Sequence, residues 1–324
     1  MYYPNDIEEI CYESEHIQKV LDEVNIHIPE YFQKYVETEG GNSVNDDAIV
    51  KLAGVFGSSS KPKPKPKDAK KILERLLKEA IKHFESDRAI YQEILHPESL
   101  AEYKDDVGSF KNTILKNQIP IIRKTLQNKA AKELDKYRTA FAQAQPGHLF
   151  EVVENIITLA EEWKNDWYDA KQFEQIGSCD DMDYYNLDEE GYTAFGVIGG
   201  GIKSHFIYKL HPEMYANRGR EAVWALWYLS DKKKFGCKED SEFLMINAEE
   251  GTTQQNYFYP YSLFAFYALS VFNKLKSLFG LQGISLPIDF RFVMVDNFLS
   301  FVARQHQDEI NVLKQNSENY HYDY

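Results

Sequence analysis

Seven residues near the first fifth of the chain restrict its fold most directly: Lys61-Pro62-Lys63-Pro64-Lys65-Pro66-Lys67. Each proline fixes φ and lacks an N–H, and each lysine before a proline is disfavoured in the helical region. The tract therefore predicts an extended polyproline II spacer, about 20 Å long at roughly 3.1 Å per residue. A ligand for an SH3-type domain is the alternative use of such a tract. With the preceding Gly57-Ser58-Ser59-Ser60, it separates an acidic N-terminal unit, residues 1–57, from the rest by a linker, residues 58–67.

Apolar side chains at helical spacing predict three short helices within residues 1–57. Pro29 is expected to begin the second of them, and Gly40-Gly41 to end it. Asn45-Asp46-Asp47 is expected to cap the third, Ala48 to Val55. The charge difference across the linker indicates that this unit moves relative to the following segment or docks onto it electrostatically.

Wide apolar stripes beyond the linker predict long helices. The first long helix begins after the N-cap candidate Asp68, the second runs from Gln118 to Ala144, and the third begins after Pro146-Gly147. A weaker helical stretch runs from Glu98 to Leu115. Residues 68–178 therefore predict an antiparallel helical bundle, closed by an acidic loop. Residues 191–315 predict a C-terminal helical domain, with helices at about 202–210, 217–230, 260–279 and 290–315, and residues 316–324 a polar tail. Because Glu242 to Asn247 is the best strand candidate, the expected fold class is all-α with at most one minor strand pair.

Charge is spread unevenly within a total of −14. Residues 61–138 carry 19 basic and 12 acidic side chains, whereas residues 139–190 carry 2 and 13. Overall acidity argues against non-specific nucleic-acid binding, but the local basic segment suits nucleic-acid phosphates or an acidic protein partner. The alternative is a solvated helical face with surplus lysine.

The chain is expected to be cytoplasmic and to have no membrane contact. Its N-terminus lacks a basic start with a following apolar run, and the apolar stretch Tyr261 to Phe272 is shorter than the roughly 20 residues that span a bilayer. The three cysteines, Cys11, Cys179 and Cys237, show neither metal-ligand spacing nor a disulfide framework. No cofactor and no metal are therefore expected, and oligomer formation stays open.

The sharpest local motif is Val197-Ile198-Gly199-Gly200-Gly201-Ile202-Lys203-Ser204, which leads into a predicted helix. A glycine-rich turn at a helix N-terminus exposes backbone N–H groups, which suit a phosphate. The candidate binding residues are Gly199, Gly201, Lys203, Ser204, Arg218 and Arg220. Neither the Walker nor the Rossmann glycine spacing is present. The alternative is a tight glycine turn that packs two core helices.

This motif resembles the hairpin of helix-hairpin-helix DNA-binding proteins, notably the DNA glycosylase superfamily. Gly199, Gly201, Lys203 and Ser204 stand where that hairpin has its glycines, its basic residue and its hydroxyl residue. The resemblance covers Val197 to Leu229 and implies a phosphate-contacting hairpin. The catalytic aspartate of the superfamily is not matched, since residues 216–219 read Ala-Asn-Arg-Gly.

Other candidates for chemistry have simpler structural interpretations. His306 and Glu309 have the i, i+3 spacing of carboxylate-bridged metal sites, but no second Glu-x-x-His accompanies them. The acidic residues around the strand candidate could hold Mg²⁺ in a nuclease, but no lysine follows to complete that site. The aromatic run Tyr257 to Tyr267 could stack bases, although it also continues as a core helix.

The leading functional hypothesis is a non-enzymatic binding or assembly protein that contacts nucleic acid or an acidic partner, with no catalytic residue assigned. A metal-dependent enzyme that processes nucleic acid or nucleotides is the rival. A pure protein–protein scaffold is the third alternative.

Overall fold

The computed structural model describes residues 7–41, 66–131, 134–238, 240–247, 252–253 and 259–320. Over these residues the fold is all-α, and one short antiparallel pair joins β1 (Ile246–Asn247) to β2 (Thr252–Thr253). The helices up to residue 192 are η1 (Glu9–Tyr12), α1 (Ser14–Gly41), α3 (Pro66–Ile94), α4 (Pro97–Glu102), α5 (Val107–Ser109), the π-helix η2 (Phe110–Gln118), α6 (Pro120–Gln127), α7 (Asp135–Gln143), α8 (Pro146–Asp166), α9 (Ala170–Phe173), α10 (Cys179–Met182), η4 (Tyr185–Asp188) and η5 (Glu190–Tyr192). The later ones are α11 (Gly200–Leu210), α12 (Arg220–Leu229), α13 (Tyr261–Leu281), η6 (Ile288–Phe290), α14 (Arg291–Gln305) and α15 (Gln307–Tyr320).

Proline marks the start of many of these helices. Pro97, Pro120 and Pro146 stand in the first turn of α4, α6 and α8, and Pro260 is the N-cap of α13. A proline there loses no intrahelical hydrogen bond and already has a helical φ. α3 likewise begins at Pro66, two residues before the predicted cap at Asp68. The rest of the Lys-Pro spacer, and the predicted helix at 48–55, lie outside the described residues.

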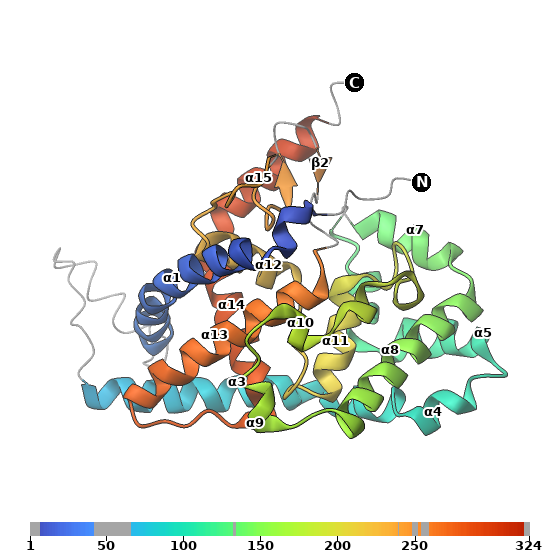
Figure 1. Ribbon diagram of the computed structural model, residues 1–324. Coiled ribbons are helices and arrows are strands. Elements are labelled where there is room, and N and C mark those ends of the chain that lie inside the picture. The colour runs from blue at the N-terminus through green and yellow to red at the C-terminus, as the bar shows by residue number, and fades with distance from the viewer. Residues whose placement is uncertain are drawn as a thin grey trace, which may run out of the picture.

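The prediction of a helix break at Pro29 is wrong, because α1 runs unbroken through it for 28 residues. Pro29 lies on the exposed side of the helix, while Val24, Ile28 and Tyr35 on the other side are almost fully buried. α1 packs against α3, α12, α13 and α14 (Figure 1). This continuous apolar contact outweighs the single backbone hydrogen bond that the proline removes.

The predicted single helix from Gln118 to Ala144 is also wrong, since α6 ends at Gln127 and α7 begins at Asp135. Arg138 bridges the break by donating hydrogen bonds to the carbonyl oxygens of Asn128 and Ala131, each at 2.9 Å. The guanidinium group supplies a donor to the Asn128 carbonyl oxygen beyond the end of α6 and a second donor to that of Ala131, which also accepts from the Leu134 N–H at 3.2 Å.

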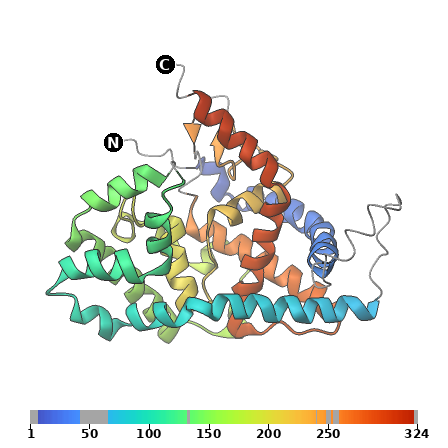
Figure 2. The same ribbon diagram turned by 180° about the vertical axis from the view of Figure 1, so that it is seen from behind.

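α11 lies in the middle of the molecule and packs against both α3 and α8 (Figures 1 and 2). α14 packs against α12, α13 and α3. The buried side chains of the N-terminal, central and C-terminal ranges therefore belong to one continuous hydrophobic cluster. The domain boundaries stay a prediction, but the core that the structure describes runs across them.

The C-terminal helices agree closely with the predicted ones, except that the stretch at 290–315 breaks at His306 into α14 and α15. Only Ile246 and Asn247 of the strand candidate are paired. The residues before them, from Ser241 to Met245, are buried without strand pairing. Among the described residues, no helix is long and apolar enough to cross a membrane.

Glu213 supplies a test of the packing between α8 and the segment after α11. Burial alone raises the pKa of its carboxyl, but hydrogen bonds with His211 and Lys164 outweigh that cost and lower the pKa from 4.5 to about 2. Because the folded pKa is lowered, this stabilisation is fully present above about pH 4.5 and is lost as the pH falls towards 2. We expect Glu213→Gln to remove about 3 kcal/mol of the acid-dependent free energy of unfolding. Urea unfolding of the natural protein and of Glu213→Gln between pH 6 and pH 2.5 measures this difference. If the free energy of unfolding falls equally with pH in the two proteins, the lowered pKa of Glu213 is contradicted.

Candidate metal centre

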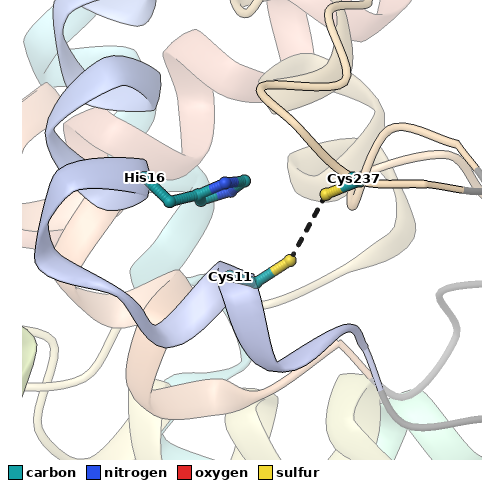
Figure 3. Close-up of side chains that lie close together, drawn as sticks. All are labelled: Cys11, His16 and Cys237. Atoms are coloured by element: carbon teal, nitrogen blue, oxygen red, sulfur yellow. Dashed lines mark hydrogen bonds between the residues drawn. The ribbon is translucent and has the colours of Figure 1, made fainter.

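Three side chains from distant parts of the sequence converge at one buried point (Figure 3). Cys11 lies in η1, His16 lies in the first turn of α1, and Cys237 follows the turns after α12. Their exposed fractions are 1%, 2% and 7%. Among the residues that the structure describes, they form the single group of three or more histidine, cysteine, aspartate or glutamate side chains that could hold a metal ion.

The distances within this Cys₂His cluster suit a tetrahedral ion. The two Sγ atoms are 3.6 Å apart, and one ligand atom from each of the three residues lies within 4.8 Å of the others. Bond lengths of about 2.3 Å to sulfur and 2.0–2.1 Å to nitrogen place tetrahedral zinc ligands roughly 3.6–3.8 Å from one another. The thiol pair already has this separation, and the imidazole needs at most a small movement to reach it.

Glu242 holds the imidazole at its Nε2 atom, and Tyr259 in turn holds Glu242. His16 Nε2 lies 2.5 Å from Glu242 Oε1, and the Tyr259 hydroxyl donates to the other carboxylate oxygen at 2.5 Å. Because an ionised carboxylate can only accept, the proton belongs on Nε2. Metal-bound histidines are characteristically held by a carboxylate at the nitrogen opposite the metal.

The other imidazole nitrogen, Nδ1 of His16, is buried and faces the backbone of Phe235 without forming a hydrogen bond of regular geometry. The ring of Phe235 packs edge-on against the imidazole at 6.0 Å. Leaving a buried polar nitrogen unsatisfied costs about 1–3 kcal/mol. Coordination of an ion through Nδ1 would use this lone pair.

The cluster also perturbs the protonation of its members. The hydrogen bond from Cys11 lowers the pKa of Cys237, with burial acting against it, whereas the pKa of Cys11 is raised by donating that bond and by burial. Burial lowers the pKa of His16, but the hydrogen bond and charge of Glu242 outweigh it, and the backbone of Phe235 adds to the rise. The thiolate at Cys237 is the form that binds a metal ion.

A strained turn brings Cys237 to this place. Gly236 has φ +103°, a conformation that favours glycine, and a Cβ atom there would lie 3.2 Å from Ile10 Cδ1. The backbone N–H of Lys238 donates to both carboxylate oxygens of Glu8, at 2.8 and 3.0 Å. The turn is thereby attached to the segment that carries Cys11.

The predicted phosphate-binding residues lie elsewhere and are largely buried. Lys203 is 3% exposed and donates to the Leu187 carbonyl oxygen. The Ser204 hydroxyl is fully buried, donates to the Gly201 carbonyl oxygen at 3.2 Å and accepts from the Arg218 N–H at 3.0 Å. Burial lowers the pKa of Lys203 to about 8, because desolvation disfavours the charged amine.

The glycine turn is shaped by the packing of Arg218. Gly199 is the N-cap of α11, and like Gly201 and Arg220 it is half-buried, whereas Arg218 is 3% exposed. These contacts match the alternative of a tight turn that packs core helices. Phosphate binding at Gly199, Gly201, Lys203, Ser204, Arg218 and Arg220 stays a prediction.

Two neighbouring glycines of this turn make a matched pair for mutagenesis. A Cβ atom at Gly200 would lie 2.0 Å from Arg218 Nη1, whereas one at Gly201 would meet only the Arg218 carbonyl oxygen, at 3.7 Å. We therefore expect Gly200→Ala to lower the free energy of unfolding by about 1–3 kcal/mol. Gly201→Ala should be neutral or stabilising by up to about 1 kcal/mol, since alanine favours a helix. Chemical denaturation compares them, and equal losses would contradict this packing.

The remaining candidates are involved in other contacts. His306 stacks on Tyr228, with ring centroids 3.7 Å apart, and its Nε2 lies 2.6 Å from the Tyr31 hydroxyl oxygen. Of the acidic residues around the strand candidate, Glu242 faces His16, while Glu239, Glu249 and Glu250 lie outside the described residues. Tyr261 to Tyr267 belong to the buried helix α13, so a core role accounts for the described part of the aromatic run.

Comparisons with known proteins add no assignment to this geometry. No protein-family model, curated protein or solved structure matches the chain. The Cys₂His cluster was missed in the sequence because Cys11 and Cys237 are 226 residues apart. Its local signals are a Cys-x₄-His pair before a helix and a cysteine directly after Gly236.

Proposed function

We propose that this chain is a metal-binding protein in which Cys11, His16 and Cys237 ligate one Zn²⁺ ion. The observation that carries the proposal is the meeting of one buried histidine with two buried thiols whose sulfur atoms are 3.6 Å apart. Thiolate together with imidazole favours zinc over calcium or magnesium, which prefer oxygen ligands. Glu242 supports the assignment by holding the far side of the imidazole.

The role proposed for the ion is structural. All three ligands are buried, so a substrate has no access to the open position that catalytic zinc needs. The three side chains leave the fourth tetrahedral position to a water molecule, because both oxygens of Glu242 already bind His16 and Tyr259. The ion would join the start of α1 to the turn after α12.

A closed structural ion supports a binding or assembly protein more than an enzyme. The buried carboxylate of Glu242 is hydrogen-bonded to the imidazole of His16, so it is not free to bind Mg²⁺ as a nuclease would require. We propose that the protein acts by binding a partner and that zinc fixes the shape of its helical framework.

Metal content tests the proposal directly. Protein purified under reducing conditions with added zinc is freed of loosely held ions, and the remaining zinc is measured by mass spectrometry. We expect one zinc per chain in the natural protein and in the control Cys179→Ser, which changes a buried cysteine outside the cluster. Cys11→Ser, Cys237→Ser and His16→Gln should each lose most of the zinc. Cobalt bound in place of zinc should show thiolate-to-metal charge-transfer absorption that disappears in the same variants.

A disulfide between Cys11 and Cys237 is the competing use of this thiol pair. It would appear as a cross-linked peptide in unreduced protein, would contain no zinc and would not depend on His16. Zinc that stays at full occupancy in Cys237→Ser, or a disulfide formed equally well in His16→Gln with no zinc in reduced protein, overturns the metal proposal.

A further inference from the structure

A second site lies far from the metal cluster in the sequence. A cavity of about 140 Å³ is bordered by the C-terminal end of α8, by α9 and by α10. Its lining includes the aromatic rings of Trp163, Trp167, Tyr168, Phe173 and Tyr184 and the carboxylates of Asp169 and Asp181. No lysine or arginine belongs to the lining.

The rings stand at angles to one another, as in a box. Trp163 lies edge-on to Tyr184 at 5.5 Å and tilted to Trp167 at 6.5 Å. Trp167 is 73% exposed, so its large apolar surface faces solvent. An aromatic ring that turns its face to the cavity offers negative electrostatic potential to a positively charged group.

Two cationic side chains of the protein already pack against aromatic rings that line the cavity. Lys164 Nζ lies 4.5 Å from the Tyr168 ring centroid, and Arg291 Cζ lies 4.7 Å from that of Phe173. Each of these cations pairs with a carboxylate, Glu213 for Lys164 and Glu174 for Arg291, and Glu174 also pairs with Lys276. These ion pairs reduce the positive charge that a further cation would meet.

The segment that supplies most of the cavity lining is strongly acidic. Residues 139–190 carry 2 basic and 13 acidic side chains. Among the residues that the structure describes, no cation pairs with the carboxylate of Asp181, while Asp169 caps α9 by accepting from two backbone N–H groups. A cationic ligand would thus meet aromatic faces and an acidic rim together.

We propose that this aromatic cavity binds a trimethylammonium group. A cavity of about 150 Å³ holds a benzene molecule, so 140 Å³ holds a head group of this size. Methylation removes the hydrogen-bond donors that the aromatic wall cannot satisfy, while the positive charge is kept for the rings and for Asp181. The group comes from a small molecule such as choline or from a trimethylated lysine side chain.

Choline and 3,3-dimethylbutan-1-ol form the decisive ligand pair, because they have nearly the same shape and differ in charge. Binding is followed by tryptophan fluorescence and by calorimetry on the full chain at constant ionic strength. We expect choline to bind at least tenfold more tightly than the neutral alcohol. Trp167→Ala and Asp181→Asn should each weaken choline binding about fivefold or more, and Asp181→Asn should leave binding of the alcohol unchanged. Phe195→Ala changes an exposed aromatic residue outside the cavity and is the control variant.

Two peptide arms distinguish the source of the group. A peptide with trimethyllysine that binds much more tightly than choline, and more tightly than the same peptide with unmodified lysine, assigns the site to a modified protein. Choline binding equal to or tighter than that of the peptide assigns it to a small molecule. Equal affinity for choline and the alcohol, no saturable binding of choline, or binding unaffected by Trp167→Ala overturns the proposal.

Discussion

Removal of zinc is expected to lower the free energy of unfolding by about 4 kcal/mol when free zinc exceeds the dissociation constant about a thousandfold. For a chain of this size, that corresponds to a fall of roughly 6 °C in melting temperature. The physical reason is that the ion binds the assembled ligands of the folded state, which lie 226 residues apart in the sequence and separate on unfolding. Thermal unfolding with and without a strong chelator measures the effect under reducing conditions.

Cys237→Ser supplies the control for this effect, because it removes one ligand of the Cys₂His cluster. The variant without chelator should melt near the chelated natural protein, and chelator should change it little further. Cys179→Ser should respond to chelator like the natural protein. A chelator effect of equal size in Cys237→Ser would place the stabilising ion elsewhere.

Arg291→Met is expected to cost about 3–5 kcal/mol of the free energy of unfolding. Arg291 is fully buried, yet it donates to the carbonyl oxygens of Glu213 and Ala170, to the Tyr168 hydroxyl oxygen and to Glu174. Methionine fills a similar volume but leaves these buried acceptors without their donor. Guanidinium unfolding monitored by circular dichroism gives the difference in free energy.

Lys276→Met is the matched comparison, because Lys276 pairs with the other oxygen of the same carboxylate, at 2.5 Å from Glu174 Oε2. Lys276 is 44% exposed, so its ion pair is screened by water and its loss should cost less than about 1 kcal/mol. Losses of similar size in both variants would contradict the view that burial of Arg291 sets its importance.

The helical class could be predicted because helical periodicity is a local property. The apolar stripe before and after Pro29, the proline at the start of α8 and the aromatic face of α13 are all visible within a few turns of sequence. The errors came where tertiary packing overrules a local signal. α1 continues through Pro29 because both halves face the same core, and the break after Gln127 is stabilised by Arg138 from the next helix.

The glycine motif shows the same limit at a candidate site. Its residues suit an exposed phosphate cradle as well as a buried turn, because spacing alone does not state which way Lys203 points. Hydrogen bonds to the Leu187 carbonyl oxygen and the Thr193 hydroxyl direct its side chain inwards. The aromatic cavity likewise depends on three helices that meet only in the folded chain.

Local patterns in the sequence were enough to predict that this chain is helical, that strands have little part in it, and that acidic and basic side chains are concentrated in different segments. Which of the scattered cysteines and histidines meet depends on how the helices pack in three dimensions. Helix formation depends on neighbours three or four residues away, whereas a metal site depends on atoms within a few ångströms in space. Cys11 and Cys237 satisfy that second condition because the segment of η1 lies against the turn after α12, a contact that no local pattern records.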